Sequence, residues 1–244
     1  MRVEIVALSG LPEVRPRDDL AGLIRGAAAK DGQPISASVI LAVAQKVVSK
    51  AEGAVVDLRQ IQPSALARSW AAECRKDPRL IELILAQSRR IVKMDRGVLI
   101  AETRLGFVCA NAGVDQSNTG CEHFATVLPA DPDASARQLR TALGCGAVLV
   151  TDTFGRPWRD GLVDVAIGVA GLEPLEDYRG SPDRRGRKLE ATVMALADQL
   201  AAAAGLLMRK SDGCPAVLIR GFEWRAGEGS AQTLIRTPER DLFR

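Results

Sequence analysis

The amino-acid sequence predicts an α+β fold, in which mixed, largely antiparallel sheets pack against helices. Strand-like and helical segments alternate irregularly along the 244 residues, without the regular strand–helix repeat of a doubly wound protein. Three strand-like segments at 91–95, 98–103 and 106–110 follow one another with glycines in the connections, which is typical of antiparallel hairpins. No Gly-x-Gly-x-x-Gly pattern follows the first strand and no P-loop pattern occurs, so neither of these nucleotide-binding folds is predicted.

Along the first half of the chain, apolar runs are punctuated by aspartate and proline. Runs rich in β-branched residues favour strands, because such side chains pack well on a pleated surface. An aspartate can cap the N-terminus of a helix, and proline is favoured in the first helical turn. We expect strands at 3–8, 39–48 and 55–58, and helices that run from Asp18 or Asp19 to Ala29, from Pro63 to Arg75 and from Pro78 to Arg90.

The second half of the chain continues this mixture. The segment 131–144 begins with Asp131 and ends with Gly144, which are preferred residues at the two ends of a helix. The alanine-rich segment 187–208 is expected to form one long helix. Apolar runs at 124–129, 147–152, 162–171 and 216–222 are expected to be strands.

Composition narrows the class of protein. A hydrophobic content of 47% is enough for one large domain, and a net charge of +3 is too weak to indicate nucleic acid or an anionic membrane as a partner. The sequence has no apolar segment of membrane-spanning length and no signal-peptide pattern, which predicts a cytoplasmic location. Five cysteines without C-x-x-C spacing and a single histidine disfavour a disulfide framework and a thiolate or His-rich metal site. We therefore expect any metal to be a hard cation on oxygen ligands.

Four polar islands, at 10–16, 44–53, 111–118 and 151–161, interrupt the apolar segments. Each follows or ends a strand-like run, which is where a scaffold presents functional side chains. Together the islands supply carboxylates and a hydroxyl for a hard cation, and cationic groups for phosphate oxygens. If the islands converge, they predict a magnesium and phosphate site. Its residues would be Asp115, Asp152, Thr153, Asn118, Gln45, Lys46, Lys50 and Arg156.

Each of these residues, taken alone, also has a structural interpretation. Asp152 fits a turn or cap better than a metal ligand, and Lys46 and Lys50 fit a solvated strand face. His123 is expected to be structural, and Trp158 fits substrate stacking and plain packing equally well. From the residues alone, the sequence therefore supports a metal-assisted, phosphate-handling enzyme and no narrower class.

The polar islands belong to longer motifs that run in order through nearly the whole chain. These are GLPEVRP at 10–16, AQKVVSKAEG at 44–53, TRLGFVCANAGVDQSN at 103–118, LPADPDASARQLR at 128–140, TDTFGRPWRDG at 151–161, VDVAIGVAG at 163–171 and PAVLIRG at 215–221. In this order they resemble the motifs of the coenzyme F420-0:L-glutamate ligase family, also called F420-0:γ-glutamyl ligase.

The resemblance implies a GTP-dependent amide ligation. The γ-phosphate of GTP would pass to the terminal carboxylate of F420-0, and the amine of L-glutamate would attack the acyl phosphate, with further γ-linked additions. The resemblance also implies one ligase domain over 1–244, an intertwined homodimer and two divalent cations, Mg²⁺ or Mn²⁺. It implies the stand-alone form of the enzyme, without a C-terminal nitroreductase-like domain.

Position by position, the resemblance assigns roles to individual residues. Asp115 and Asp152 resemble the ligands of one divalent cation, and Thr153 resembles a ligand of the second. Asp115, Asp152 and Lys50 would carry catalysis. The residues that match GTP-contacting positions are Leu11, Pro12, Glu13, Val14, Gln45, Lys46, Lys50, Asn118, Met208, Arg209, Lys210, Ser211, Asp212, Gly213, Cys214 and Pro215.

Three residues depart from the family pattern. Lys210 stands where other members can carry an oxygen ligand to the second metal, and an ammonium group has no lone pair to donate. Arg209 replaces an expected glycine, and Leu105 replaces a common histidine. Two alternatives therefore stay open, a related GTP-dependent ligase for another carboxylate acceptor and a non-catalytic nucleotide-binding relative.

Overall fold

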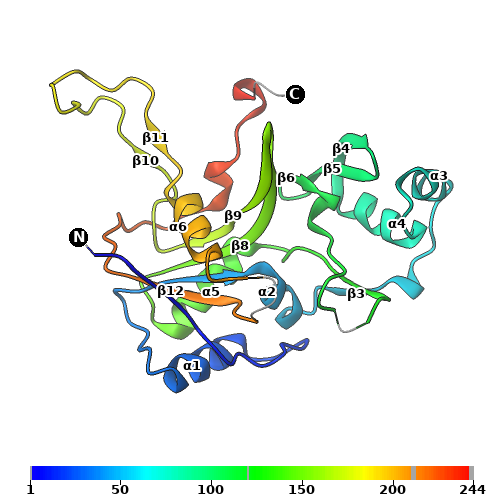
Figure 1. Ribbon diagram of the computed structural model, residues 1–244, viewed down its shortest axis with the longest axis horizontal. Helices are drawn as coiled ribbons and strands as arrows, with labels where there is room; N and C mark the ends of the chain where they lie inside the picture. The colour runs from blue at the N-terminus through cyan, green and yellow to red at the C-terminus, as the bar shows by residue number, and fades with distance from the viewer. Residues whose placement is uncertain (1, 120, 210–212, 242–244) are drawn as a thin grey trace.

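The computed structural model describes residues 2–119, 121–209 and 213–241. Its centre is a five-stranded sheet with the strand order β1-β12-β2-β8-β9 (Figure 1). Strands β2 and β8 pair in parallel, and the other neighbours in this sheet are antiparallel. This arrangement confirms the expected α+β class with mixed, largely antiparallel sheets. The strands are β1 (Glu4–Ala7), β2 (Ile40–Ala44), β8 (Ala147–Arg156), β9 (Arg159–Ala170) and β12 (Ala216–Arg220).

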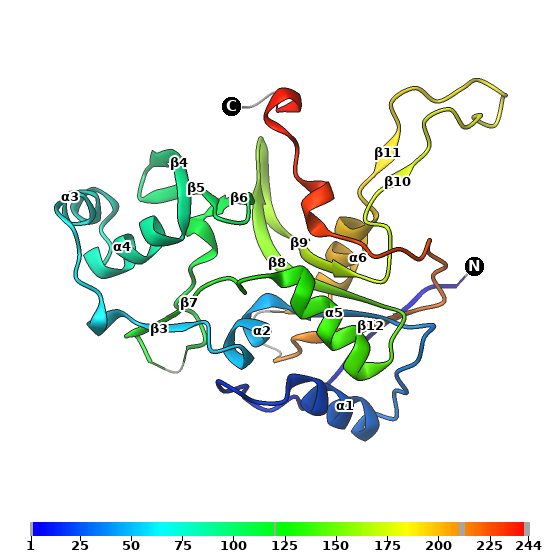
Figure 2. The same ribbon diagram turned by 180° about the vertical axis from the view of Figure 1, so that it is seen from behind.

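Helices cover both faces of this sheet. Helix α6 (Leu196–Gly205) lies in front of the sheet in Figure 1, and α5 (Pro132–Leu143) lies in front of it in Figure 2, which is the opposite view. Helix α5 has the predicted ends, since the Asp131 side chain caps its N-terminus and Gly144 follows it in the left-handed conformation. Helix α1 (Leu20–Lys30) starts after its N-cap Asp19.

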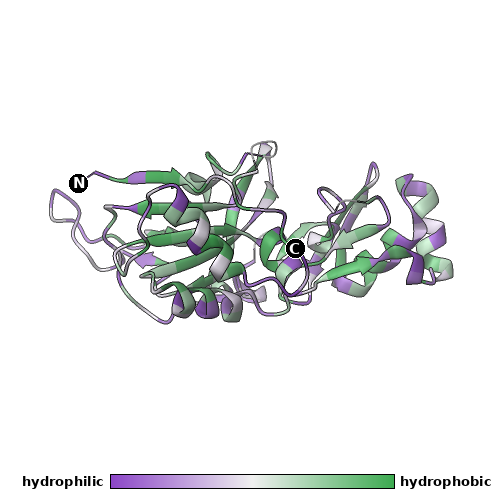
Figure 3. Ribbon diagram, turned by 90° about the horizontal axis from the view of Figure 1, so that it is seen from below, coloured by the Kyte–Doolittle hydropathy of each residue, from purple (hydrophilic) through white to green (hydrophobic). Residues whose placement is uncertain are grey.

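A second group of elements lies beside the central sheet (Figure 3). It has its own core, which includes Ile81, Ile84 and Leu99, whereas the main core is built on β2, β8 and β12. A short pair, β3–β7, and an antiparallel sheet, β4-β5-β6, form its strands. Its elements are β3 (Val55–Asp57), α3 (Ala65–Cys74), α4 (Pro78–Gln87), β4 (Ser88–Asp95), β5 (Val98–Thr103), β6 (Val108–Ala110) and β7 (Phe124–Thr126).

The expected strand at 39–48 is wrong in its second half. Strand β2 ends at Ala44, and helix α2 (Gln45–Ala51) begins at the next residue. The β-branched Val47 and Val48 favour a strand locally, but the chain leaves the sheet at this point and the tertiary context overrides that preference. Lys46 and Lys50 therefore lie on a helix, and the interpretation as a solvated strand face does not hold.

The expected long helix at 187–208 is also wrong in part. Residues 176–177 (β10) and 193–194 (β11) form a two-stranded arm that extends away from the sheet in Figure 1, and helix α6 covers only Leu196–Gly205. The alanine-rich part of the segment forms the helix, because alanine has the highest helix propensity. Thr192 and Val193, which are β-branched, lie where the arm returns to the sheet and β11 pairs with β10.

A smaller difference between the predicted and the observed elements concerns the end of helix α4. The helix expected to end at Arg90 ends at Gln87, because β4 begins at Ser88 and pairs with β5.

Within the described ranges, no helix has the length and apolar character needed to cross a bilayer. Short 3₁₀ turns complete the chain at η1 (Leu58–Gln60), η2 (Asn111–Gly113), η3 (Ala231–Leu234) and η4 (Pro238–Arg240).

The packing of α5 on β9 yields a stability prediction. A Cβ atom at Gly168 would lie 2.3 Å from the carbonyl oxygen of Pro132, and this backbone group in the first turn of α5 has little freedom to move. We expect Gly168→Ala to lower the free energy of unfolding by about 1–3 kcal/mol, as overpacking typically does. Urea denaturation measures the effect.

Gly155→Ala is the matched control, because its Cβ would meet only Leu162 Cδ2, at 3.8 Å, within a 4 Å radius. Gly155 is also a strand residue, on β8, and this variant should be as stable as the wild type. Equal stability of the two variants would contradict the proposed close contact.

Candidate active site

A cavity of about 590 Å³ opens where the parallel strands β2 and β8 lead out of the sheet. The carboxyl ends of parallel strands are a common place for ligand binding, because the following loops diverge there. Ala44 at the end of β2 and Thr151 to Thr153 of β8 form part of the wall. Segments 11–14 and 115–118 contribute further wall residues, so the structure brings the four polar islands together.

Most of the residues assigned by sequence line this cavity. They are Leu11, Pro12, Glu13, Val14, Gln45, Lys46, Lys50, Asp115, Asn118, Asp152, Thr153, Met208, Arg209, Gly213, Cys214 and Pro215. Lys210, Ser211 and Asp212 lie outside the described residues. Arg156 lies outside the cavity wall, at the exposed end of β8, where its Nη2 donates to the Asp160 carbonyl.

Helix α2 presents its first lysine to the loop that contains Asp115. The ammonium group of Lys46 donates to Asp115 Oδ2 at 2.6 Å and to the Ser117 carbonyl at 2.9 Å. The Ser117 amide donates to Asp115 Oδ1 at 2.7 Å. Burial raises the pKa of the Asp115 carboxyl, but the hydrogen bonds from Lys46 and Ser117 outweigh burial and hold that pKa below its usual value. Asp115 is therefore an anion at neutral pH.

The second lysine of α2 contacts the same loop and one further segment, residues 11–14. Lys50 is buried, and its ammonium group donates to the Glu13 carboxylate and, at 2.6 Å, to the Asn118 carbonyl. The Glu13 side chain is largely exposed, so the charge pair has one end in water. Lys50 thus holds segments 11–14 and 115–118 at the cavity.

The backbone before Asp115 adopts an unusual conformation. Asn111, Ala112 and Gly113 have φ angles of 53°, 52° and 73°, in the left-handed region that non-glycine residues rarely adopt. Beyond this turn, Asp115 exchanges two backbone hydrogen bonds with Thr126. Left-handed backbone at non-glycine residues persists only where the surroundings hold it, and such strain concentrates at functional sites. Here the turn directs the chain from β6 into the cavity wall.

The hairpin of β8 and β9 supplies the other side of the cavity. The Thr153 amide donates to Asp152 Oδ1 at 2.8 Å, and the Thr153 hydroxyl lies 2.5 Å from Asp164 Oδ1. Burial, together with the negative charge of Asp152, raises the pKa of the Cys109 thiol to about 12. Cys109 is therefore a neutral thiol at neutral pH.

Some lining residues were not singled out from the sequence. They include Ser117, Thr151 and Asp164. Asp164 carried a usable signal, because an aspartate inside the apolar run LVDVAIGVAG has to face something polar. Its partner could not be inferred from sequence, because the pairing of Asp164 with Thr153 depends on the register of the hairpin.

The donor set fits a hard divalent cation. Asp115, Asp152 and Thr153 offer oxygen atoms, and the described residues contain no group of three or more His, Cys, Asp or Glu side chains able to hold a metal ion. This combination suits Mg²⁺ or Mn²⁺ bound by one or two carboxylates, because such ions commonly complete their coordination with substrate phosphates and water.

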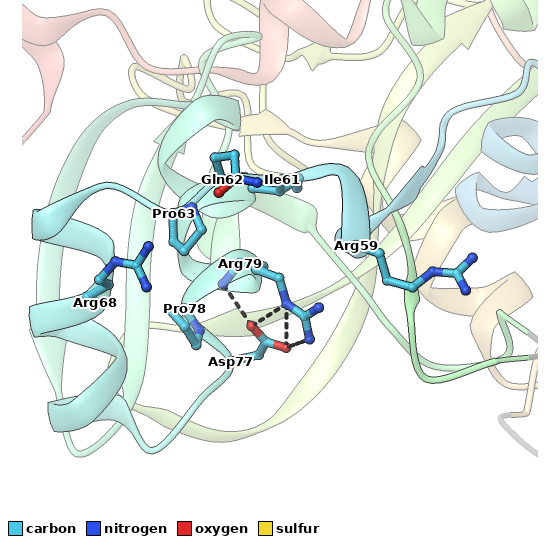
Figure 4. Close-up of a pocket in the computed structure, with 8 residues that line it drawn as sticks. All are labelled: Arg59, Ile61, Gln62, Pro63, Arg68, Asp77, Pro78 and Arg79. Carbon is cyan, nitrogen blue, oxygen red and sulfur yellow. Dashed lines mark hydrogen bonds and ion pairs between the residues drawn. The ribbon is translucent and has the colours of Figure 1, made fainter.

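A separate depression of about 570 Å³ lies in the second group of elements (Figure 4). Asp77 caps α4 and accepts hydrogen bonds from the Arg79 side chain, while Arg59 points away from this pair. None of the described residues assigned by sequence lines this depression. Its wall is formed by Arg59, Ile61, Gln62, Pro63, Arg68, Asp77, Pro78 and Arg79.

His123 and Trp158 lie away from both cavities. The His123 ring is 4.0 Å from the Glu122 carboxylate, and neither residue belongs to the described walls. Trp158 is 77% exposed at the turn between β8 and β9, so it does not pack in a core. A role for Trp158 in stacking on a substrate stays a prediction.

The fold and the cavity define a class of protein. An α+β chain whose loops gather lysines, carboxylates and a hydroxyl in one cavity has the composition of an enzyme site for phosphate chemistry. The family model described as F420-0:Gamma-glutamyl ligase matches residues 10–221. The chain therefore belongs to this family of ligases, as its motifs indicated.

Relatives in archaea support this assignment along the whole chain. A protein of Methanothermobacter thermautotrophicus is 45% identical and covers 100% of both chains, and one of Methanopyrus kandleri is 46% identical over 100% of this chain and 98% of its own. A protein of Methanocaldococcus jannaschii is 41% identical over 86% of each chain. All three are named coenzyme F420:L-glutamate ligase.

The lowered pKa of Asp115 predicts a pH dependence of stability. The unfolded carboxyl has a pKa of about 3.9, so the contribution of Asp115 is present above about pH 4. It is lost as the pH falls through the lower pKa of the folded state. We expect the difference in unfolding free energy between wild type and Asp115→Asn to shrink as the pH is lowered from 7 to 3 in urea titrations.

Asp160→Asn is the control for this experiment, because Asp160 is exposed and lies outside the cavity wall. Its stability should follow that of the wild type at every pH. A difference between wild type and Asp115→Asn that does not depend on pH would contradict the assigned ion pair.

Proposed function

We propose that this ligase adds L-glutamate to coenzyme F420-0 at the expense of GTP, and that further glutamates are added through γ-linkages. Membership of the family and the shared name of its relatives support the acceptor and the amino acid. The observation that carries the proposal is the convergence of both lysines of α2 with Asp115 and Asp152 at one cavity. Phosphoryl transfer to a carboxylate needs such a set, because it brings like charges together.

The proposed reaction has two steps. A carboxylate oxygen of F420-0 attacks the γ-phosphorus of GTP, the bond to the β-phosphate oxygen breaks, and GDP leaves behind an acyl phosphate. The amine of L-glutamate then attacks the acyl carbon, inorganic phosphate leaves with the bonding electrons, and the nitrogen loses a proton to form the amide. No redox step is needed, and the energy of one phosphoanhydride bond drives the formation of one amide bond.

The lysines of α2 have a defined task in this scheme. Lys46 and Lys50 already donate to anionic or carbonyl oxygens at the cavity, so their ammonium groups lie where phosphate oxygens can accept from them. Arg209 also lines the cavity, where the family pattern has a glycine, and it would add a further positive charge beside the nucleotide. Segments 11–14 and 208–215 would hold the rest of GTP.

Asp115 and Asp152 would hold one divalent cation, and the Thr153 hydroxyl would serve a second. Such cations, when bound, neutralise the charge of the transferred phosphoryl group. The protein's own contribution is to fix these oxygens on a strand and on a loop that is hydrogen-bonded to α2. This fixed geometry lowers the reorganisation needed during the reaction.

We also propose a homodimer that works in the cytoplasm on small-molecule substrates, without nucleic acid or membrane as a partner. The arm of β10 and β11 offers a surface for contact with another protein chain, because it extends from the sheet and carries partly exposed apolar side chains (Figure 1). These side chains are Leu175, Tyr178, Val193 and Met194.

Mass spectrometry of reaction products tests the proposed function. Purified protein is incubated with F420-0, L-glutamate, GTP and Mn²⁺ or Mg²⁺, and each component is omitted in turn. We expect a product heavier by one or more glutamyl residues that requires both GTP and the metal. Consumption of GTP without a glutamylated product would point to another carboxylate acceptor, and the absence of any turnover would point to a nucleotide-binding relative without catalysis.

Asp152→Asn tests the role of the carboxylate on β8. The change removes a negative charge while keeping the shape of the side chain, so we expect kcat to fall by at least about 10²-fold with an unchanged thermal midpoint. Steady-state assays and thermal denaturation measure the two effects. Asp160→Asn is the control and should retain full activity, whereas wild-type turnover by Asp152→Asn would contradict the metal role.

Lys50→Ala tests the nucleotide role of α2. Loss of a charged donor should raise the Kd for GTP by about tenfold. The free energy of unfolding should fall by less than the free energy of GTP binding, because the partner Glu13 is largely exposed. Isothermal titration with GTP measures the affinity. Lys93→Ala removes an exposed lysine from the second group of elements and should leave the Kd unchanged. An unaltered Kd in Lys50→Ala would remove Lys50 from the site.

A further inference from the structure

We infer that Asp164 is a positioning residue of the active site, whose carboxylate takes the hydroxyl hydrogen of Thr153, so that this hydroxyl would meet a metal ion with its oxygen lone pairs and not with its hydrogen. The inference rests on the proposed function, because it concerns how Thr153 is prepared to meet a cation. No role for Asp164 follows from the family motifs considered above.

The two residues face each other across the hairpin. Thr153 on β8 is the register partner of Asp164 on β9, and Thr153 Oγ1 lies 2.5 Å from Asp164 Oδ1. Directly opposed residues on antiparallel strands have side chains on the same face of the sheet. Both side chains line the cavity. The contact therefore belongs to the site and is not a surface pair elsewhere on the hairpin.

The direction of this hydrogen bond follows from the chemistry of the two groups. The Thr153 hydroxyl is the donor and Asp164 Oδ1 is the acceptor. A hydroxyl has one hydrogen and two lone pairs, and the bond to Asp164 uses the hydrogen. Because a cation is bound by lone pairs and repelled by a hydroxyl hydrogen, Asp164 selects the orientation of Thr153 that can bind metal.

Asp164 is unsuited to act as a third carboxylate on the same ion as Asp115 and Asp152. In the described part of the chain, no three acidic, histidine or cysteine side chains are close enough together to hold a metal ion. Asp164 nevertheless adds negative charge to the cavity wall. Its effect on the metal is therefore expected to pass through Thr153.

Helix α6 leaves room for the Asp164 carboxylate. A Cβ atom on Gly205, the last residue of α6, would lie 2.2 Å from Asp164 Oδ2 and 2.9 Å from its Cγ. Gly205 is outside the positive-φ region, so its backbone conformation does not require glycine. The close approach of Asp164 gives a physical reason for glycine at the end of this helix.

Metal binding tests the inference directly. Mn²⁺ is titrated into the full-length protein with GTP present and glutamate and F420-0 absent, and binding is followed by the electron paramagnetic resonance of free Mn²⁺. We expect Asp164→Ala, which removes the acceptor of the Thr153 hydroxyl, to weaken one class of Mn²⁺ site by about 10- to 100-fold, as loss of a partner behind a metal ligand typically does. Asp160→Ala, on the same strand, should bind Mn²⁺ like the wild type.

A double-mutant cycle shows whether Asp164 acts through Thr153. Thr153→Val removes the hydroxyl with little change in shape, and Asp164→Ala is then combined with it. We expect Asp164→Ala to have no further effect on Mn²⁺ affinity in the Thr153→Val protein. Fully additive effects, or wild-type Mn²⁺ affinity in Asp164→Ala, would overturn the inference.

Gly205→Ala offers an independent test that keeps every charge. The added methyl group should displace the Asp164 carboxylate and weaken the same class of Mn²⁺ site. Gly26→Ala is the matched helix control, because a Cβ at Gly26 in α1 would meet nothing within 4 Å. Wild-type Mn²⁺ affinity in a folded Gly205→Ala protein would contradict the proposed contact.

The two proposals can fail separately. If the wild type makes the glutamylated product and Asp164→Ala binds Mn²⁺ equally well, only the inference about Asp164 fails. If the wild type binds Mn²⁺ with GTP and Asp164→Ala does not, but F420-0 is not glutamylated, only the proposed acceptor fails.

Discussion

The parallel pairing of β2 with β8 is the constraint from which the candidate site follows. Parallel strands point their carboxyl ends to the same edge of the sheet, so helix α2 after β2 and residues 151–153 of β8 meet there. An antiparallel pair would have sent these segments to opposite edges. The two lysines of α2 therefore face the aspartates of the cavity because of strand direction, although about 100 positions of sequence separate them from β8.

Charge pairing then fixes the loops that the sheet brings together. Lys46 holds the loop of Asp115, and Lys50 holds Glu13 and the backbone of Asn118. Ion pairs with a partly exposed partner contribute up to about 1 kcal/mol, so these contacts add only modestly to the stability of the fold. Their effect is to set the places of cations and anions around one cavity. In the proposed function, these groups would exchange their protein partners for phosphate and metal.

The β8–β9 hairpin joins the main core to the chemistry of the site. The part of β9 that contains Gly168 is buried between α5 and α6, and the absence of a side chain at Gly168 lets the first turn of α5 approach the strand. Nearer the turn of the hairpin, the same two strands carry Asp152, Thr153 and Asp164 at the cavity wall. A rigid hairpin keeps side chains in register, so a hydroxyl and a carboxylate can be placed opposite each other with little freedom. The short contact at Gly205 shows that α6 is shaped to this pair.

The α+β class, most segments and the family can be predicted from the amino-acid sequence, because periodicity, caps and long motifs are local properties of the chain. The caps Asp131 and Gly144 and the meander of 91–110 are examples. The end of β2, the length of α6 and the pairing of Asp164 with Thr153 became known only from the three-dimensional structure. Val47 and Val48 favour a strand locally, but the chain leaves the sheet before them and they form part of helix α2. Strand direction and register depend on contacts between distant residues, and such contacts leave no periodic signal in one sequence.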